Sequence, residues 1–351
     1  MRLIPLPLSA LIPMLFAADT SPVVKVDQER LQRLQKTPMP KIDKVLAFNT
    51  PEADAVLAAL AIFPPDNAWN LPVEDWPLAP NSTTMIAGIG AAKPLRGNTD
   101  MGFVLVPPHQ KKVEVKLTAY AEESDKGPYP VPDKAVIEGW PAAFKRDEAT
   151  KNLSLEEVQR GKPDLDSDRH GIVVDPVNHR LYEFYRLTRT DAGWTAEQAS
   201  IFDLKSNKLR PEGWTSSDAA GLPIFPAIVR FDELKRGKIE HALRCTFRNT
   251  RRAYVHPATH FASRKTDPDL PRMGERFRLR KDFDASKFSN EVKVIIAALK
   301  RYGMINADNG LDWALSIAPD ERIPLIHEEL RRIKGSDFEV VTAPPGYLPP
   351  K

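Results

Sequence analysis

Alternating apolar and polar residues fill the middle of the chain and predict strands. The clearest alternation lies at residues 238–247 (KIEHALRCTF), where Ile239, Leu243 and Phe247 share one face with His241. A period of two residues is typical of a half-buried strand. The short apolar runs at residues 171–175 and 181–185 are separated by a turn, which predicts a hairpin.

Other strands and a few helices follow from the same reasoning. Further strands are predicted at residues 102–106, 113–119, 193–204, 252–256, 277–283 and 338–341. Helical spacing of apolar residues predicts helices at residues 28–35, from residue 51 to about 61, and at 289–302 and 323–334. The second of these has Thr50 as its cap and Pro51 in its first turn.

The predicted elements are short, and the proline content agrees with that. The chain of 351 residues holds 33 prolines and 17 glycines. Proline is poorly tolerated inside helices and central strands, so this content favours many short elements joined by ordered turns. We expect a β-rich fold: a single-domain sandwich or jelly-roll-like sheet with flanking helices.

The N-terminus has the pattern of an export signal. Arg2 supplies a positive charge, residues 3–16 are apolar, and Ala17 and Ala18 offer small residues for cleavage. The apolar run is short and interrupted by prolines, so we expect no stable membrane insertion. The expected organisation is therefore a signal peptide at 1–18, a lead-in segment at 19–48, one globular domain at 49–342 and a Pro-rich tail at 343–351, in a secreted or periplasmic protein.

Charge and cysteine content exclude several classes of function. The 50 basic and 47 acidic residues give a net charge of only +3, so we expect no nucleic-acid partner. The single cysteine, Cys245, excludes an intrachain disulfide and a multi-cysteine metal site. The sequence contains no Gly-rich phosphate loop, no G-x-S-x-G elbow and no C-x-x-C, which argues against nucleotide enzymes, serine hydrolases and redox proteins.

Three ionisable residues suggest a catalytic pocket. Glu183 lies between an apolar and an aromatic residue on its strand face, and such surroundings raise a carboxyl pKa toward that of a general acid. Asp218 lies in the small-residue segment 213–221, where the backbone can approach a ligand closely. His241 is either a core histidine with a hydrogen-bond partner or a general base. The alternatives for the two carboxyl groups are a Glu183 paired with an arginine across the sheet and an Asp218 that caps a helix.

Two chemistries remain open for these residues. Hydrolysis of a glycosidic bond needs two carboxyl groups of different pKa, and Glu183 and Asp218 are the expected pair. Elimination needs a base and a cation that neutralises a uronate, and His241 or His170 with Arg252 is expected to supply them.

Aromatic and polar residues complete the expected binding site. Trp214, Tyr254 and Trp313 are the candidates for stacking on sugar rings, with Asp312 and His256 as further contacts.

We expect no metal and no cofactor. The spacing of His256 and His260 resembles a metal-binding pair on a helix, but Pro257 disfavours helical geometry there. The acidic residues Glu122, Glu123 and Asp125 offer hard oxygen ligands without a recognised metal spacing, so we interpret this stretch as a solvated turn.

Four runs of the sequence carry a resemblance to known proteins: GWTSSDAAGLPIFPAIVRFDE, HALRCTFRNTRRAYVHPATHFAS, MGERFRLR and ALKRYGMINADNG. They resemble a group of exported bacterial proteins to which no activity is assigned, over residues 63–341. The resemblance implies export and a single folded unit.

The expected function is that of an exported carbohydrate-active enzyme, which cleaves a polysaccharide by hydrolysis or elimination. The first alternative is a secreted protein that binds a carbohydrate or another ligand without catalysis. The second is a structural envelope protein, in which the same ionisable residues are polar positions with ordinary partners.

Overall fold

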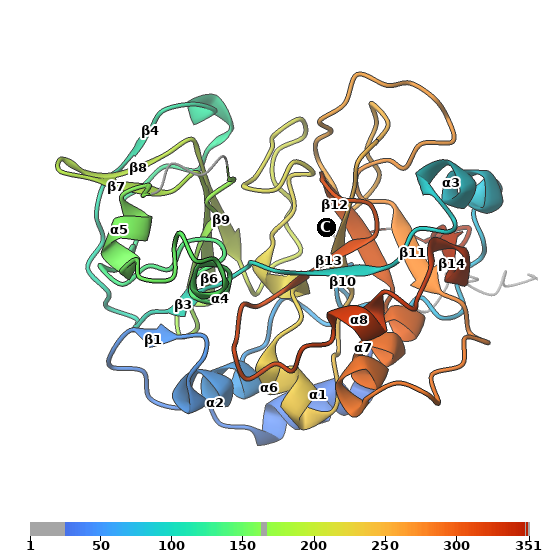
Figure 1. Cartoon of the computed structure of the whole chain (residues 1–351), viewed down its shortest axis with the longest axis horizontal. Helices are drawn as coiled ribbons and strands as arrows, with labels where there is room; N and C mark the ends of the chain where they lie inside the picture. The colour runs from blue at the N-terminus through green and yellow to red at the C-terminus, as the bar shows by residue number, and fades with distance from the viewer. Residues whose placement is uncertain (1–24, 163–166, 348, 350–351) are drawn as a thin grey trace, which may run out of the picture.

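The chain folds into three mixed sheets with helices around them (Figure 1). The computed structural model describes residues 25–162, 167–347 and 349, so the expected export signal lies outside the described residues. Helices and strands each account for 21% of the fold. The prediction of a β-rich fold is therefore confirmed only in part: the chain is mixed α/β, and its open sheets do not form a clear sandwich or jelly roll.

The first sheet has five strands in the order β1-β3-β5-β6-β9. These strands are β1 (Leu46–Ala47), β3 (Val104–Leu105), β5 (Gly171–Asp175), β6 (Arg180–Tyr185) and β9 (Gln198–Asp203). The predicted hairpin is confirmed as β5 and β6, which pair antiparallel with Ile172 opposite Glu183. This register fixes Glu183 in the middle of the sheet.

The second sheet has six strands in the order β14-β11-β12-β10-β13-β2. They are β2 (Arg96–Thr99), β10 (Leu243–Phe247), β11 (Arg276–Leu279), β12 (Met304–Asn309), β13 (Ala314–Ile317) and β14 (Phe338–Val341). The central strand β10 is parallel to β12 and antiparallel to β13. The register of β10 and β12 shifts between Cys245 and Thr246, so that Cys245 is opposite Asn306 but Thr246 is opposite Asp308.

A small third sheet joins β4 (Val115–Leu117), β8 (Gly193–Ala196) and β7 (Thr188–Thr190). The single strand predicted at residues 193–204 is thus wrong, because it is split into β8 and β9 in two different sheets. The strand predicted at 252–256 is also absent from this part of the described chain, where Tyr254 forms only an isolated bridge with Met273.

Four of the helices, α1, α2, α5 and α7, begin at a residue whose side chain caps the first turn. The described helices are α1 (Gln28–Lys36), α2 (Pro51–Ala59), α3 (Ser82–Ile89), α4 (Ala142–Arg146), α5 (Leu155–Gln159), α6 (Phe231–Arg236), α7 (Asn290–Arg301) and α8 (His327–Leu330), with 3₁₀ turns η1 (Ala121–Glu123), η2 (Phe225–Ala227) and η3 (Gly335–Asp337). Thr50 caps α2 and Ser289 caps α7 through their side-chain oxygens, as expected. The helix predicted at 323–334 is reduced to the single turn α8.

Both faces of the six-stranded sheet are buried along β10, β11 and β13. One face and the surrounding helices form an apolar cluster with Leu243, Phe247 and Trp313 at its centre. The second apolar cluster combines residues of the five-stranded sheet with Ile305 of β12. Figure 1 shows the two larger sheets on opposite sides of the molecule with yellow loops between them. None of the described helices is long and apolar enough to span a bilayer.

Candidate functional site

The segment from Thr215 to Leu222 runs between the two larger sheets and holds a tight polar turn. The Ser216 hydroxyl donates to the Leu222 carbonyl at 2.6 Å, and it accepts from the Asp218 N–H at 3.0 Å. Gly221 has a φ of +73°, and a Cβ there would lie 2.1 Å from Thr259 Oγ1. Only glycine fits this position without strain. The turn therefore holds Asp218 in one place against β10.

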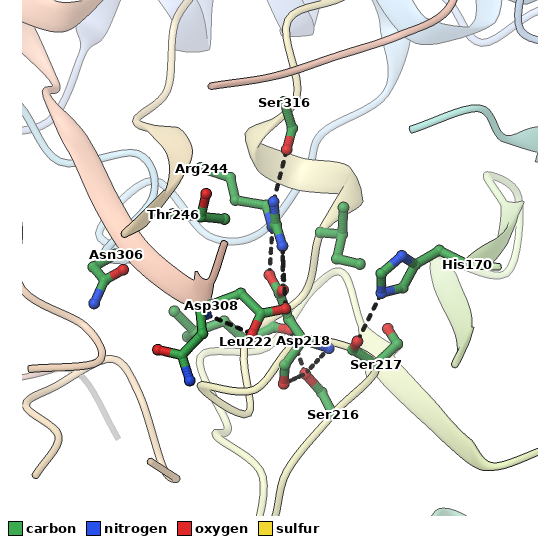
Figure 2. A network of polar contacts seen from close by, with 12 residues as sticks. His170, Ser216, Ser217, Asp218, Leu222, Arg244, Thr246, Asn306, Asp308 and Ser316 are labelled. Atoms are coloured by element: carbon green, nitrogen blue, oxygen red, sulfur yellow. Dashed lines mark hydrogen bonds and ion pairs between the residues drawn. The ribbon is translucent and has the colours of Figure 1, made fainter. Parts of the chain in front are cut away.

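Asp218 forms a buried ion pair with Arg244. Arg244 Nε donates to Asp218 Oδ2 at 2.6 Å, and Nη2 donates to Oδ1, so the contact is bidentate. The third nitrogen, Nη1, donates to Ser316 Oγ on β13 at 2.8 Å. The side chain of Arg244 is 5% exposed and that of Asp218 is fully buried. A buried pair of this kind is tolerated because its donors and acceptors are satisfied (Figure 2).

Asp308 lies beside this pair at the end of β12. Its Oδ2 is 3.5 Å from Arg244 Nη2, and its side chain is 18% exposed. The register shift in the β10–β12 pairing places Asp308 opposite Thr246, which is two residues after Arg244. Burial holds the pKa of Asp308 well above its ordinary value, and the neighbouring Asp218 charge raises it further, while Arg244 acts in the opposite direction. Asp308 is therefore a carboxyl group disposed to keep its proton.

His170 joins the network from the side of the five-stranded sheet. Its Nδ1 is 3.1 Å from Glu138 Oε2, and its Nε2 is 2.9 Å from the carbonyl oxygen of Ser217. Burial alone would lower the pKa of His170, but the Glu138 carboxylate, with Asp218 and Asp168, raises it to about 10. Both ring nitrogens then donate, and the imidazolium connects Glu138 to the turn that carries Asp218.

Asp100 and Glu138 add two more acidic groups to this region. Burial and the nearby Glu138 charge raise the pKa of Asp100 to about 7. Asp100 Oδ1 is buried and accepts no hydrogen bond from the described residues. For Glu138 the effect of burial is outweighed by His170, which lowers the pKa of Glu138.

Glu183 contacts the same loop, but from inside the core. It accepts hydrogen bonds from the N–H of Phe225 at 2.8 Å, from the N–H of Ile224 at 3.0 Å and from Ser217 Oγ at 3.3 Å. Burial raises the pKa of Glu183 to about 7 against the effect of the two N–H donors. The expected rise in pKa is present. The side chain is fully buried and caps the start of η2, so it has no direct access to a ligand.

A polar cleft of about 270 Å³ lies over the network. Its lining comes from both larger sheets and from the loops between them, and consists of Tyr120, Glu123, Asp168, Tyr185, Gln198, Thr215, Ser216, Ser217, Ala219, His260, Ala262, Asp308 and Asn309. Three of these residues are acidic, and none of the described lining residues is lysine or arginine. Among Asp218, Arg244, His170 and Asp308, it is Asp308 that lines the cleft.

His241 is not part of this cleft. The strand predicted at 238–247 begins only at Leu243, so the alternation that placed His241 on a sheet face does not apply. His241 is buried, with Nε2 2.9 Å from Glu233 Oε1 and Nδ1 2.8 Å from the Ala242 carbonyl oxygen. It belongs to a separate polar cluster with Arg230 and lines a different, smaller cavity. The core interpretation of His241 fits these contacts.

Trp313 and Asp312 do not form a pocket rim. Trp313 is fully buried, stacks on Phe338 and donates through Nε1 to the Gly90 carbonyl, so its ring cannot stack on a sugar. Asp312 pairs with Lys93 and accepts from the Arg248 N–H, which makes it part of a surface turn. Neither residue lines the cleft, and these contacts do not support the expected roles of Trp313 and Asp312 in binding.

The remaining aromatic candidates and Arg252 lie outside the cleft lining. The Arg210 guanidinium lies over the Trp214 ring, with its carbon Cζ 5.5 Å from the ring centre. Tyr254 donates to Glu212 Oε1 at 2.7 Å and stacks on Phe261. Arg252 is exposed and lies 5.8 Å above the same Phe261 ring.

The ring of Phe261 connects Tyr254 and Arg252 to the cleft, because it also stacks on His260, which is a lining residue. His256 instead faces a separate cavity of about 30 Å³, and burial there, with Arg276 nearby, lowers the pKa of His256 to about 4.

Four residues of the network were not predicted: Asp100, Glu138, Arg244 and Asp308. For Arg244 a signal was available, since it forms the polar face of the strand with Thr246. For Asp308 the stretch Asp-Asn-Gly is typical of a turn, while the two aspartates and the tryptophan at 308–313 indicate a pocket rim. Asp100 and Glu138 lie in loop-rich stretches whose spacing carries no signal.

Among the residues that the structure describes, no group of three or more histidine, cysteine, aspartate or glutamate side chains is arranged to hold a metal ion. No family model, curated protein or solved structure matches this chain.

Proposed function

We propose that the protein is an exported enzyme that hydrolyses glycosidic bonds in a polysaccharide, with Asp308 as the general acid. The observation that carries this proposal is the position of Asp308, which reaches a polar cleft and lies against the buried Asp218–Arg244 pair. Glycoside hydrolysis requires a carboxyl group that keeps its proton until it donates it to the leaving oxygen. The raised pKa of Asp308 supports that role.

The other residues of the network act on Asp308 or on the ligand. Asp218 is a positioning residue: it is fully buried, and its charge makes ionisation of Asp308 unfavourable. Glu123 and Asp168 line the same cleft and are the candidates for the second carboxylate, which activates water or attacks the anomeric carbon. Tyr185 and Asn309 also line the cleft, and their polar side chains can hydrogen-bond sugar hydroxyls.

Hydrolysis is favoured over elimination by the charge of the cleft. Elimination from a uronate needs a cation to neutralise its carboxylate. None of the described lining residues is lysine or arginine. Arg244 already donates to Asp218 and Ser316, and Arg252 lies above Phe261 outside the lining.

A second candidate function is carbohydrate binding without catalysis. The full burial of Asp218 and Glu183 favours it, because these carboxyl groups then serve as structural anchors of the loop. A structural role in the cell envelope would leave the cleft without a ligand. The residues 3–16 support export in all three cases, and a secreted or periplasmic location is part of the proposal.

The test is a polysaccharide panel digested with the purified protein. Reducing ends report hydrolysis, and absorbance from unsaturated uronates reports elimination. We expect reducing ends from at least one substrate, and a loss of about 10²- to 10⁴-fold in kcat for Asp308→Asn, as for removal of a general acid. The matched control is Asp43→Asn, because Asp43 is an exposed aspartate that does not line the cleft.

Full activity in Asp308→Asn would contradict the assigned role. Binding of a panel member without release of products would support the binding protein instead, and unsaturated products would support elimination.

A further inference from the structure

The lining of the cleft includes an exposed aromatic side chain. Tyr120 lines the cleft, yet 50% of it is exposed, which is unusual for a large aromatic residue. Its φ of +45° lies in the left-handed region, which residues other than glycine rarely adopt. The Tyr120 carbonyl accepts from Ser124 Oγ at 2.8 Å and from the Glu123 N–H at 3.1 Å. These contacts hold the Tyr120 backbone in this conformation in spite of the strain.

A second tyrosine and two carboxyl groups share this cleft with Tyr120. Tyr185 lies at the end of β6, and its ring centre is 5.9 Å from that of His170. Glu123 follows Tyr120 in η1, and one of its oxygens, Oε2, accepts from the Thr215 N–H at 2.8 Å. Asp168 is exposed beside the start of β5. Tyrosine faces together with carboxylates form a site that attracts an ammonium group and an apolar sugar face at once.

We propose that the cleft recognises an amino sugar with a free ammonium group, and that the substrate is a polysaccharide containing such residues. This inference deepens the proposed function and rests on the same cleft. Tyr120 supplies the stacking surface, while Asp168 and Glu123 supply the negative charge that pairs with the ammonium. An N-acetylated sugar lacks that charge, and a uronate is repelled by the same carboxylates.

The observation that favours a cation over a neutral ligand is the composition of the lining. Apart from Asp308, which keeps its proton beside Arg244, the acidic residues of the lining are Glu123 and Asp168, and the described lining residues include neither lysine nor arginine. His260 already uses Nδ1 in a contact of 2.7 Å with the Ala219 carbonyl oxygen. A charged ligand group therefore restores the balance of charge in a partly enclosed site, where electrostatic attraction is stronger than in bulk water.

The test is a binding comparison by isothermal titration calorimetry with the full chain. The probes are glucosamine, N-acetylglucosamine and glucose oligosaccharides of equal length and linkage. We expect the glucosamine oligomer to bind at least tenfold more tightly than the other two, with a preference that weakens as salt is raised. In Asp168→Asn and Glu123→Gln the preference should fall, because each change keeps the shape and removes one charge. In Tyr120→Ala all three affinities should fall together.

The outcomes separate this inference from the proposed function. The binding measurement is repeated with Asp308→Asn, which tests recognition without cleavage. Preferential binding of the glucosamine oligomer without any hydrolysis by the wild-type protein supports the recognition and overturns the enzyme proposal. Hydrolysis of a neutral or N-acetylated polysaccharide without preference for the glucosamine oligomer overturns the recognition and supports the enzyme. Equal affinities in Asp168→Asn and the wild-type protein for all probes also overturn it.

Discussion

Replacing Arg244 with methionine should strongly destabilise the protein. The change removes the guanidinium from between Asp218, Ser316 and Asp308 and keeps most of the aliphatic volume. The Asp218 side chain is fully buried, so its carboxylate cannot recover solvation by moving to the surface. Breaking one partner of a buried pair costs about 3–5 kcal/mol. The lost hydrogen bond to Ser316 adds about 1 kcal/mol.

The measurement is unfolding in guanidinium chloride followed by tryptophan fluorescence. With a slope of about 4–6 kcal/mol per molar denaturant, a total loss of about 4–6 kcal/mol lowers the midpoint by roughly 0.7–1.5 M. The matched control is Arg280→Met, which breaks an ion pair between side chains that are 52% and 74% exposed. Exposed pairs contribute little, so the control midpoint should not move measurably.

A double variant separates the ion pair from the loss of packing. In Arg244→Met with Asp218→Asn no buried charge is left unpaired, so the double variant should lose less stability than the sum of the two single variants. Simple additivity would show that the two side chains are not coupled. A midpoint for Arg244→Met equal to that of Arg280→Met would refute the reasoning about the buried pair altogether.

Two further predictions concern His241 and Glu183. His241→Ala should lower the free energy of unfolding by about 1–3 kcal/mol, because Glu233 loses a buried hydrogen-bond partner. The same change should leave kcat unchanged. A loss of activity without a loss of stability would show that His241 acts in catalysis. Glu183 has a folded pKa of about 7, above its unfolded value of about 4.3, so its contribution to stability is complete below the unfolded pKa and is lost as pH rises through 7. Glu183→Gln should therefore reduce the fall in unfolding free energy between pH 5 and 7 by up to about 1.4 kcal/mol per pH unit, and parallel curves would contradict this.

The elements that the sequence predicts well are those set by local chemistry. Thr50 and Ser289 cap their helices with their own side chains, and the β5–β6 hairpin needs only a short turn between two apolar runs. The ends of the strand around His241 were missed because pairing with β12 and β13, far along the chain, decides where β10 begins. The break between β8 and β9 likewise depends on which sheet each half joins.

The site was predicted only where a residue's immediate neighbours reveal its surroundings. Glu183 lies between apolar residues, and Asp218 lies among small ones, so both could be found. Alternation also shows that Arg244 lies on a polar strand face, but it does not show whether that face meets solvent or a buried carboxylate. The role of Asp308 depends on the irregular register between β10 and β12, which leaves no trace in either strand alone.

The N–H groups at the start of the turn η2 donate hydrogen bonds to a side chain of the five-stranded sheet. A helix is usually capped by a residue next to its first turn in the sequence. Here the capping residue is Glu183 of β6, which accepts hydrogen bonds from the N–H groups of Ile224 and Phe225. The same loop presents Asp218 to Arg244 on β10. A hinge motion that parted the two sheets would have to break both attachments together. The two attachments therefore fix the position of the loop that forms part of the cleft, and the proposed polysaccharide would bind without movement of one sheet relative to the other.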